Sequence, residues 1–379
     1  MKKMILAMDS YKDCLSSEEV EEAVAAGIHR VFPELAVCSV PMADGGEGML
    51  EVLVRLTHGY KVKVESHDAL MRPIIAEYGV LGDGTTAVVE MAQSCGLPLL
   101  KPEERNPWLT TSYGTGEILR RVLDGGFRKI IMGLGGSATN DAGMGMMQAL
   151  GARFYNKKGE CLGIGCGGLL EAVDDFDLQL FRQHLQMVNL VAACDVDSPF
   201  CGPRGASYVF APQKGADFPM VERLDRGMHH YARTIERRLG ISVMDTAGAG
   251  AAGGMGGGLS AFFQSDLVPG IDLILKEIGF QSIAEGAVGI ITGEGKSDRQ
   301  TLLGKVPAGI LRVGQRMQLP VALLSGAVEE KESLFAAGFS QVRAVTPRNM
   351  SLSEALQPEV ARRNIREAAV ELMKDFRFF

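Results

Sequence analysis

The chain has 379 residues, of which 46% are hydrophobic and 22% are charged, and its formal net charge is −7. These proportions are ordinary for a globular protein, and a chain of this length can bury a large core and is expected to form two or more domains. The acidic balance argues against a nucleic-acid partner, because phosphate backbones are bound by basic surfaces. It does not argue against a local site for a small anion.

Cysteine and histidine spacing bears on redox state and metal binding. None of the seven cysteines forms a C-x-x-C pair, so we expect them to be reduced thiols. The histidines contain no H-x-x-x-H pair, which argues against a zinc site. The apolar run at residues 4–8 is too short for a signal peptide, and no later run is long enough to span a bilayer. We therefore expect a cytoplasmic protein without a membrane partner.

Both ends of the chain alternate between short apolar runs and helical patterns. The first part has a buried strand at residues 4–8, a helix that begins at the capping box of Ser16 and Glu19, and a strand at residues 36–40. The last third continues the alternation, with strands over residues 288–291, 321–324 and 342–345 and helices over residues 305–317 and 330–337. Such alternation predicts a doubly wound α/β domain whose parallel sheet is completed by the first two strands.

The middle of the chain begins with a different pattern. Alternating strands are predicted over residues 61–65, 74–80 and 87–90, and Gly82-Asp83-Gly84 is a hairpin signal. We place a domain boundary here, so that residues 1–60 and 285–379 form one domain and residues 61–284 form an inserted α/β domain. The active site is expected in the cleft between the two domains.

A glycine-rich turn follows the apolar run at residues 130–132. Its sequence is Gly-Leu-Gly-Gly-Ser-Ala-Thr-Asn-Asp over residues 133–141, and it leads into a helix that extends to Leu150. Glycine lets the backbone approach a ligand closely, and unpaired N–H groups at a helix start favour an anion. In the alternative interpretation, Ser137 or Thr139 is an ordinary helix cap, but a cap needs only one such residue. The turn therefore predicts a phosphate or carboxylate site.

Polar clusters also follow other predicted strands. Asp9-Ser10-Tyr11-Lys12 follows the first strand, and Asp44-Gly45-Gly46-Glu47 follows the second. Asp195 and Asp197 follow an apolar strand at residues 188–193, and Arg204 and Lys214 come soon after. Ligands bind at the carboxyl ends of strands in open α/β sheets, and these acids and bases could hold Mg²⁺ and an anionic substrate. For the segment that begins at Asp195, a solvated loop with local aspartate caps explains the spacing equally well, whereas the first two clusters, at equivalent strand ends, favour a site.

A run of small residues occupies positions 248–258, with glycine at most of them. The run contains alanine and methionine but no charged or hydroxyl side chain, so it is too apolar for a flexible linker. It predicts either close packing of backbone segments or a hinge.

The sequence contains partial matches to two nucleotide-binding motifs. Gly293-Glu294-Gly295-Lys296-Ser297 is similar to the end of a P-loop, but Ile290 stands where that motif needs its first glycine. Residues 133–138 fit the G-x-G-x-x-A form of the dinucleotide fingerprint, but the acidic residue about twenty positions later is missing. A nicotinamide-dependent hydroxy-acid dehydrogenase therefore stays open as the weaker alternative.

Over essentially its full length the chain resembles the bacterial type I glycerate kinases. The matching segments occur in the family's order: Asp9-Ser10-Tyr11-Lys12, residues 42–48, 135–141, 193–206 and 213–215, and residues 292–295 with Asp298, Gln300-Thr301 and Gly304-Lys305. Three positions depart from the family pattern, because Asp13 and Ala142 stand where glycine is usual and Met8 where proline is usual. These departures leave the polar site positions intact and bear only on local backbone geometry.

The resemblance implies an ATP- and Mg²⁺-dependent kinase that phosphorylates D-glycerate, in the bacterial members usually on the C2 hydroxyl. It also implies a flavodoxin-like domain made from both chain ends, with a second α/β domain inserted. Formation of 3-phosphoglycerate and a non-catalytic sensor of small acids are further alternatives, beside the dehydrogenase. The residues decide neither the hydroxyl that is phosphorylated nor the oligomeric state.

Phosphoryl transfer depends on charge neutralisation and in-line positioning, which suggests a role for each polar candidate. We expect Asp195 to accept the glycerate proton, Lys12 to balance phosphate charge, and Lys214 with Arg204 to hold the glycerate carboxylate. Asp141 and Asp197 are the candidate Mg²⁺ ligands. The other candidates are Ser10, Gly135, Gly136, Ser137, Thr139 and Asn140 for the nucleotide and Asp44, Glu47, Glu294 and Asp298 for the substrate, the last two being a rival acidic pair.

Overall fold

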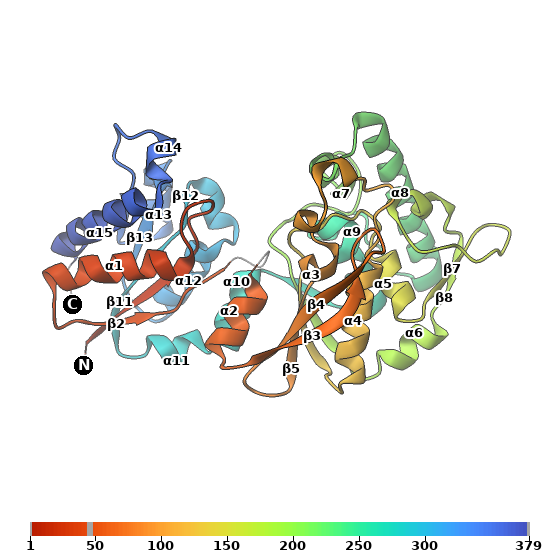
Figure 1. Ribbon diagram of the computed structural model, residues 1–379, viewed down its shortest axis with the longest axis horizontal. Coiled ribbons are helices and arrows are strands. Elements are labelled where there is room, and N and C mark those ends of the chain that lie inside the picture. Colours follow the sequence, from red (N-terminus) through yellow and green to blue (C-terminus); the bar gives the residue numbers. More distant parts are fainter. Residues whose placement is uncertain (1, 44–47, 377–379) are drawn as a thin grey trace. The chain divides into compact units, whose positions relative to one another are not determined.

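A computed structural model describes residues 2–43 and 48–376 of the chain (Figure 1). The chain divides into two compact units. The terminal unit consists of Met1–Asp44 and Ile271–Phe379, and the inserted unit is Gly45–Gly270. Each unit is an α/β fold in which helices pack on a sheet, so the predicted fold class is confirmed.

The limits of the two units differ from the predicted boundaries at residues 60 and 285. Helix α2 (Met49–Leu56) contacts the first strands of the inserted unit, and the amide of Leu50 donates a hydrogen bond of 2.9 Å to Glu90. At the other limit, Ile271 at the start of α10 (Gly270–Glu277) packs against Gly309 of the terminal unit. These two contacts place the segment after residue 44 with the insert and the segment after residue 270 with the terminal unit.

A five-stranded parallel sheet forms the centre of the terminal unit. Its strands lie in the order β2 (Ala36–Ser39), β1 (Lys3–Met8), β11 (Ala287–Gly293), β13 (Val321–Ser325) and β15 (Gln341–Ala344). Counted along the unit, this order is 2-1-3-4-5, the order of flavodoxin-like folds. The predicted flavodoxin-like domain, built from both chain ends, is therefore confirmed.

The helices of the terminal unit cover this sheet. Met4, Leu6 and Met8 point to one face of β1 and pack in one core cluster with residues of α1 (Ser17–Val31) and α15 (Pro358–Asp375), two helices that lie side by side (Figure 1). Because side chains alternate along a strand, the other face is left for α12 (Val306–Arg316), which contacts β1, β11 and β13. The remaining elements are α11 (Phe280–Ala284), α13 (Lys331–Ala337), α14 (Leu352–Ala355) and the short pair β12 (Lys296–Ser297) and β14 (Ala327–Val328).

The inserted unit has a mixed six-stranded sheet. Its order is β10 (Asp266–Val268), β9 (Asn189–Ala193), β6 (Lys129–Gly133), β5 (Thr86–Glu90), β4 (Pro73–Val80) and β3 (Tyr60–His67). β3, β4 and β5 pair antiparallel, as the alternating pattern and the turn at Gly82-Asp83-Gly84 predict, whereas β5, β6, β9 and β10 are parallel. The parallel part brings the carboxyl ends of β6 and β9 to the same edge of the sheet.

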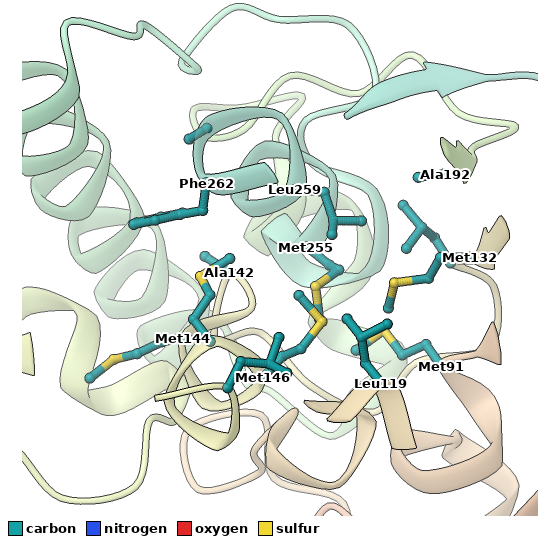
Figure 2. Close-up of a cluster of buried hydrophobic side chains, with 14 of the residues drawn as sticks. Met91, Leu119, Met132, Ala142, Met144, Met146, Ala192, Met255, Leu259 and Phe262 are labelled. Carbon is teal, nitrogen blue, oxygen red and sulfur yellow. The ribbon is translucent and has the colours of Figure 1, made fainter. Parts of the chain in front are cut away.

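The core of the inserted unit is rich in methionine. Met91, Met132, Met144, Met146 and Met255 are fully buried and come together with Leu119 and Leu259 (Figure 2). The unbranched thioether side chain fits irregular gaps, which suits a core assembled from short helices. The helices are α3 (Ala92–Cys95), α4 (Tyr113–Asp124), α5 (Met144–Ala149), α6 (Gln179–His184), α7 (Ala206–Phe210), α8 (Phe218–Leu239) and α9 (Ala251–Gly258), beside the small pair β7 (Arg153–Tyr155) and β8 (Asp175–Asp177).

The small-residue run at positions 248–258 packs backbone against backbone. A Cβ atom on Gly253 would lie 2.1 Å from the carbonyl oxygen of Thr139, and one on Gly258 would lie 2.4 Å from that of Ala142. The amide of Ala142 in turn donates a hydrogen bond of 3.0 Å to Gly253. Of the two interpretations, close packing is therefore the one that the structure bears out, and the segment packed against it is the predicted anion-binding turn.

Two further predictions from composition can be compared with the structure. All seven cysteines carry free thiols, as their spacing predicts. Among the residues that the structure describes, no helix combines the length and the apolar character that crossing a bilayer requires.

Candidate functional site

The glycine-rich turn after β6 is held by a neighbouring segment. The carbonyl of Gly136 accepts a 2.7 Å hydrogen bond from Leu97, and the amide of Ala138 donates a 2.7 Å bond to Cys95. Gly136 has a φ of 69° and is exposed, whereas Ser137 beside it is buried. The turn thus presents backbone at Gly135 and Gly136 to solvent while its polar side chains point inward.

Lys214 lies beneath this turn. Its side chain is 1% exposed, and its ammonium group donates to Ser137 Oγ at 2.9 Å and to the carbonyl oxygen of Thr139 at 2.6 Å. Burial lowers the pKa of Lys214 to about 7, although the nearby carboxylate of Asp141 acts in the opposite direction. The sequence-based role, in which Lys214 grips the glycerate carboxylate directly, does not match this burial. Lys214 instead supports the turn from behind.

Asp141 is fully buried and hydrogen-bonded on both carboxylate oxygens. Oδ2 accepts from the amide and hydroxyl of Ser112 at 2.8 and 2.7 Å and from the amide of Gly145 at 3.2 Å, and Oδ1 accepts from the amide of Gly143 at 3.2 Å. Burial raises the pKa of its carboxyl group, and these hydrogen bonds act to lower it. The bonds from Gly143 and Gly145 occupy amides at the start of α5, so they are not available to a phosphate.

These bonds leave Asp141 a poor fit to the predicted role of Mg²⁺ ligand. A metal would have to displace the donors that already bind the fully buried carboxylate of Asp141. No set of three histidine, cysteine or acidic residues within the described parts of the chain could hold a metal ion. Asp141 therefore fits the role of an anchor that ties α5 to the start of α4.

Replacing Asp141 by asparagine should destabilise the fold. In either orientation, the NH₂ group of asparagine would face a donor, the amide of Gly143 or the groups of Ser112. The change would also remove the negative charge that stabilises the nearby ammonium of Lys214, so the expected loss is about 3 kcal/mol in the free energy of unfolding. Urea denaturation in buffer without Mg²⁺ measures it, with the exposed Asp197→Asn as the matched control. Unchanged stability combined with a raised Mg²⁺ requirement would restore Asp141 as a metal ligand.

The buried Lys214 should leave a pH signature on stability. Its pKa is about 7 in the folded chain and about 10.4 in an unfolded one, so the unfolded chain binds more protons between these values and stability rises with pH. Relative to Lys214→Met, the wild-type chain should therefore gain about 2 kcal/mol between pH 7 and pH 9.

Urea denaturation of both chains at several pH values measures this difference. Lys158→Met, in an exposed turn of the same unit, is the matched control and should follow the wild-type curve. A constant gap between the wild-type and Lys214→Met curves would mean that the ammonium group does not titrate in this range.

The segment after β9 carries exposed polar residues at the same sheet edge. Asp195 Oδ1 accepts a 2.8 Å hydrogen bond from the amide of Gly270, and Asp197 and Arg204 are exposed. Asn140 of the turn reaches the next helix in this direction, because its Nδ2 lies 3.2 Å from Ser207 Oγ of α7. β6 and β9 are neighbours, so the glycine turn and the Asp195 segment follow adjacent strand ends.

The terminal unit has its own polar cluster at the carboxyl ends of its strands. Glu294 is buried, and its Oε1 accepts from Ser297 at 3.0 Å and Thr301 at 2.6 Å, while its Oε2 lies 3.2 Å from Lys305 Nζ. Glu294, Ser10 and Lys12 line a cavity of about 400 Å³. Three of the predicted candidates are thus brought together within this unit.

Other candidates lie apart from this cavity. Asp298 does not line it, because its Oδ1 accepts a 2.8 Å bond from Gln300 and caps the following turn of helix. This is the structural role that a local aspartate cap would have. Asp44 and Glu47 lie outside the described residues.

No role is assigned from the sequence to two residues that hold these buried carboxylates. Ser112 holds Asp141, and Lys305 pairs with Glu294. Ser112 stands in a run of hydroxyl residues before α4, and Lys305 follows a glycine before α12. The sequence therefore indicates that each residue lies at the start of a helix. Neither signal names a partner, because the partner comes from a distant part of the chain.

Comparison with known proteins shows which family the chain belongs to. The model of the glycerate kinase family matches residues 4–377. A glycerate kinase of Bacillus subtilis (strain 168) is 40% identical over 98% of this chain and 97% of its own, and the glycerate 2-kinase of Escherichia coli (strain K12) is 41% identical over 86% of each. A crystal structure described as glycerate kinase 2 from Salmonella typhimurium LT2 superposes with a TM-score of 0.85 at 41% identity, over 98% of this chain and 97% of that one. The chain belongs to the glycerate kinase family.

Proposed function

We propose that the chain transfers the γ-phosphoryl group of ATP to D-glycerate and that the product is 2-phospho-D-glycerate. The observation that carries the proposal is the turn of Gly135 and Gly136, whose exposed backbone is backed by the buried ammonium of Lys214. Backbone amides backed by a lysine side chain suit a polyphosphate. The choice of the C2 hydroxyl follows the printed name of the Escherichia coli relative.

The reaction needs an oxygen nucleophile, a proton acceptor and charge neutralisation. The glycerate hydroxyl oxygen bonds to the γ-phosphorus, and the bond from that phosphorus to the β–γ bridging oxygen breaks, so that ADP leaves with the electron pair. Asp195 takes the hydroxyl proton. Its Oδ1 accepts a hydrogen bond from the amide of Gly270, which holds the carboxylate in place after β9.

The remaining charged residues hold the two substrates. Arg204, exposed in the segment that follows Asp195 in the chain, is suited to the glycerate carboxylate, because a guanidinium binds a carboxylate with two parallel hydrogen bonds. Lys12 balances phosphate charge. Lys214 acts as a positioning residue through Ser137 and Thr139.

Of the two candidate Mg²⁺ ligands, only one fits the role. Kinase sites often hold it through one or two carboxylates together with the substrate phosphates, so a cage of three acidic residues is not required. Asp197 is exposed and would hold the ion, whereas Asp141 does not fit. When bound, Mg²⁺ neutralises charge on the phosphates.

The free thiols of all seven cysteines fit a reducing compartment, and we place the enzyme in the cytoplasm. The net charge of −7 supports small-molecule partners over nucleic acid.

An assay with ATP, Mg²⁺ and D-glycerate, followed by phosphorus NMR of the product, tests the proposal. The expected result is ADP and 2-phosphoglycerate in equal amounts, with L-glycerate as the control acceptor. A 3-phosphoglycerate signal would reverse the choice of hydroxyl. ATP that remains unconsumed in the presence of D-glycerate would refute the kinase assignment for this chain.

A further inference from the structure

The cavity of about 400 Å³ in the terminal unit is lined by many residues besides the three predicted polar candidates. It is lined by the segments that follow β1, β11, β13 and β15, so it lies along the carboxyl edge of the parallel sheet. In a sheet of order 2-1-3-4-5, the chain reverses direction between the first and third strands, and ligands bind at that point. Here those strands are β1 and β11, which are followed by Lys12 and Glu294.

The lining has an apolar side and a polar side. The apolar side consists of Tyr11, Val345, Leu352, Ala355, Leu356 and Ala361. The polar side includes Lys12, Glu294, Lys305 and Asn364. A ligand that fits both sides has an apolar ring system joined to hydroxyl and anionic groups.

The size of the cavity indicates which of the two substrates of a glycerate kinase it could hold. At ~30 Å³ of liquid volume per water molecule, it has room for about a dozen waters. Glycerate has only three carbons, so it would leave most of this space empty and would give the apolar side nothing to cover. A nucleoside fills such a space and buries its base against apolar side chains.

We propose that this cavity binds the adenosine part of the nucleotide, with the base against Leu352 and Ala355 and the ribose hydroxyls donating to Glu294. The inference rests on the proposed function, because it names the place where the nucleotide of that reaction is held. A carboxylate after a strand end is a common ribose ligand in nucleotide-binding α/β folds.

Asn364 supports adenine as the base. The side-chain amide is the group that pairs with the polar edge of adenine. The Nδ2 atom of Asn364 lies 3.2 Å from the sulfur of Met350, which is a weak acceptor, so a ring nitrogen of the base would be a better partner.

Calorimetric titration of the full chain with Mg²⁺·ADP tests the proposal through a pair of variants on α14. Ala355→Trp fills the cavity, whereas Ser353→Trp places the same side chain on the exposed side of the same helix. Ala355→Trp should weaken ADP binding at least about tenfold, and Ser353→Trp should leave it unchanged. Leu352→Ala, which removes an exposed side chain and does not threaten folding, should weaken it about threefold. Equal affinity in all four chains would overturn the proposal.

A second measurement needs no substitution. Cys14 lines the cavity and is half-buried, whereas Cys161 is exposed in the inserted unit. Saturating Mg²⁺·ADP should slow alkylation of Cys14 by N-ethylmaleimide, followed by peptide mass spectrometry, without slowing that of Cys161. Saturating D-glycerate should protect neither thiol. Protection of Cys14 by glycerate alone would assign the cavity to the acceptor and overturn the proposal.

The outcomes separate this inference from the proposed function. If the chain phosphorylates glycerate and Ala355→Trp retains wild-type ADP affinity, the nucleoside lies elsewhere and only the inference fails. If the chain binds ADP in the way expected here but transfers no phosphate to glycerate, the inference stands and the proposed function fails.

Discussion

Replacing Asp195 by asparagine is expected to lower kcat about a thousandfold while the free energy of unfolding stays within about 0.5 kcal/mol of the wild-type value. The amide oxygen of asparagine can still accept the 2.8 Å hydrogen bond from Gly270, so the loop keeps its anchor. What is lost is the ability to take the proton of the attacking hydroxyl. Asp195 is exposed, so the substitution leaves no buried polar group without a partner. Steady-state kinetics and urea denaturation of the same preparation measure the two quantities.

Asp197→Asn is the matched control for this prediction, because it makes the same change in the same exposed segment. As the proposed ligand of Mg²⁺, Asp197 should affect the Mg²⁺ concentration needed for half-maximal rate more than the maximal rate itself. The opposite pattern, with near-normal kcat in Asp195→Asn and a collapse of kcat in Asp197→Asn, would exchange the two assignments.

The sequence predicts the terminal unit well because each step follows from local patterns. Alternating strand and helix signals at both ends require a parallel sheet, and right-handed connections allow few orders of its strands. The limits of the inserted unit are harder to predict. The apolar face of α2 shows that this helix packs on a sheet, but periodicity does not show which of two sheets it covers. Its packing on β4 and β5 depends on contacts made only after folding.

The candidate site residues likewise differ in how much the local sequence reveals about their surroundings. Parallel strands end at one edge, so polar residues after strands are reasonable ligand candidates, and Ser10, Lys12 and Glu294 do line one cavity. The environment of Lys214 could not be predicted, because Gln213-Lys214-Gly215 has the composition of an exposed turn. Its partner Ser137 lies 77 positions away in the chain, and only the folded structure removes the lysine from water.

Two departures from the family pattern have a structural counterpart. Asp13 and Ala142 stand where glycine is usual, and their φ angles are 61° and 51°. Both lie in the left-handed region that L-residues adopt at a cost of about 1–2 kcal/mol, aspartate more readily than alanine. The effect on local backbone geometry that the resemblance suggested is therefore located at these two turns. At Ala142 the strain falls directly after the glycine-rich turn of residues 133–141, where the backbone is held by the hydrogen bond to Gly253.

Gly253→Ala is expected to reduce the free energy of unfolding by about 4 kcal/mol, which is large for a single added methyl group. The new Cβ would lie 2.1 Å from the carbonyl oxygen of Thr139 and 2.7 Å from Cα of Asn140, and both are main-chain atoms that cannot rotate away. The φ of 69° at this position adds the strain of a left-handed alanine. Urea denaturation monitored by circular dichroism measures the loss.

Gly159→Ala separates backbone strain from steric overlap. Gly159 has a φ of 79° and open space around the position of its Cβ, so alanine there should cost only about 1 kcal/mol. The carbonyl oxygen that Gly253→Ala would displace is the one that accepts the 2.6 Å bond from Lys214, so the fraction of this variant that remains folded should also turn over more slowly. Equal losses of stability in the two variants, with normal kcat in both, would mean that the small-residue run does not support the turn. If Gly253→Ala alone loses both stability and rate, the buried lysine and the glycine turn depend on the backbone packed behind them.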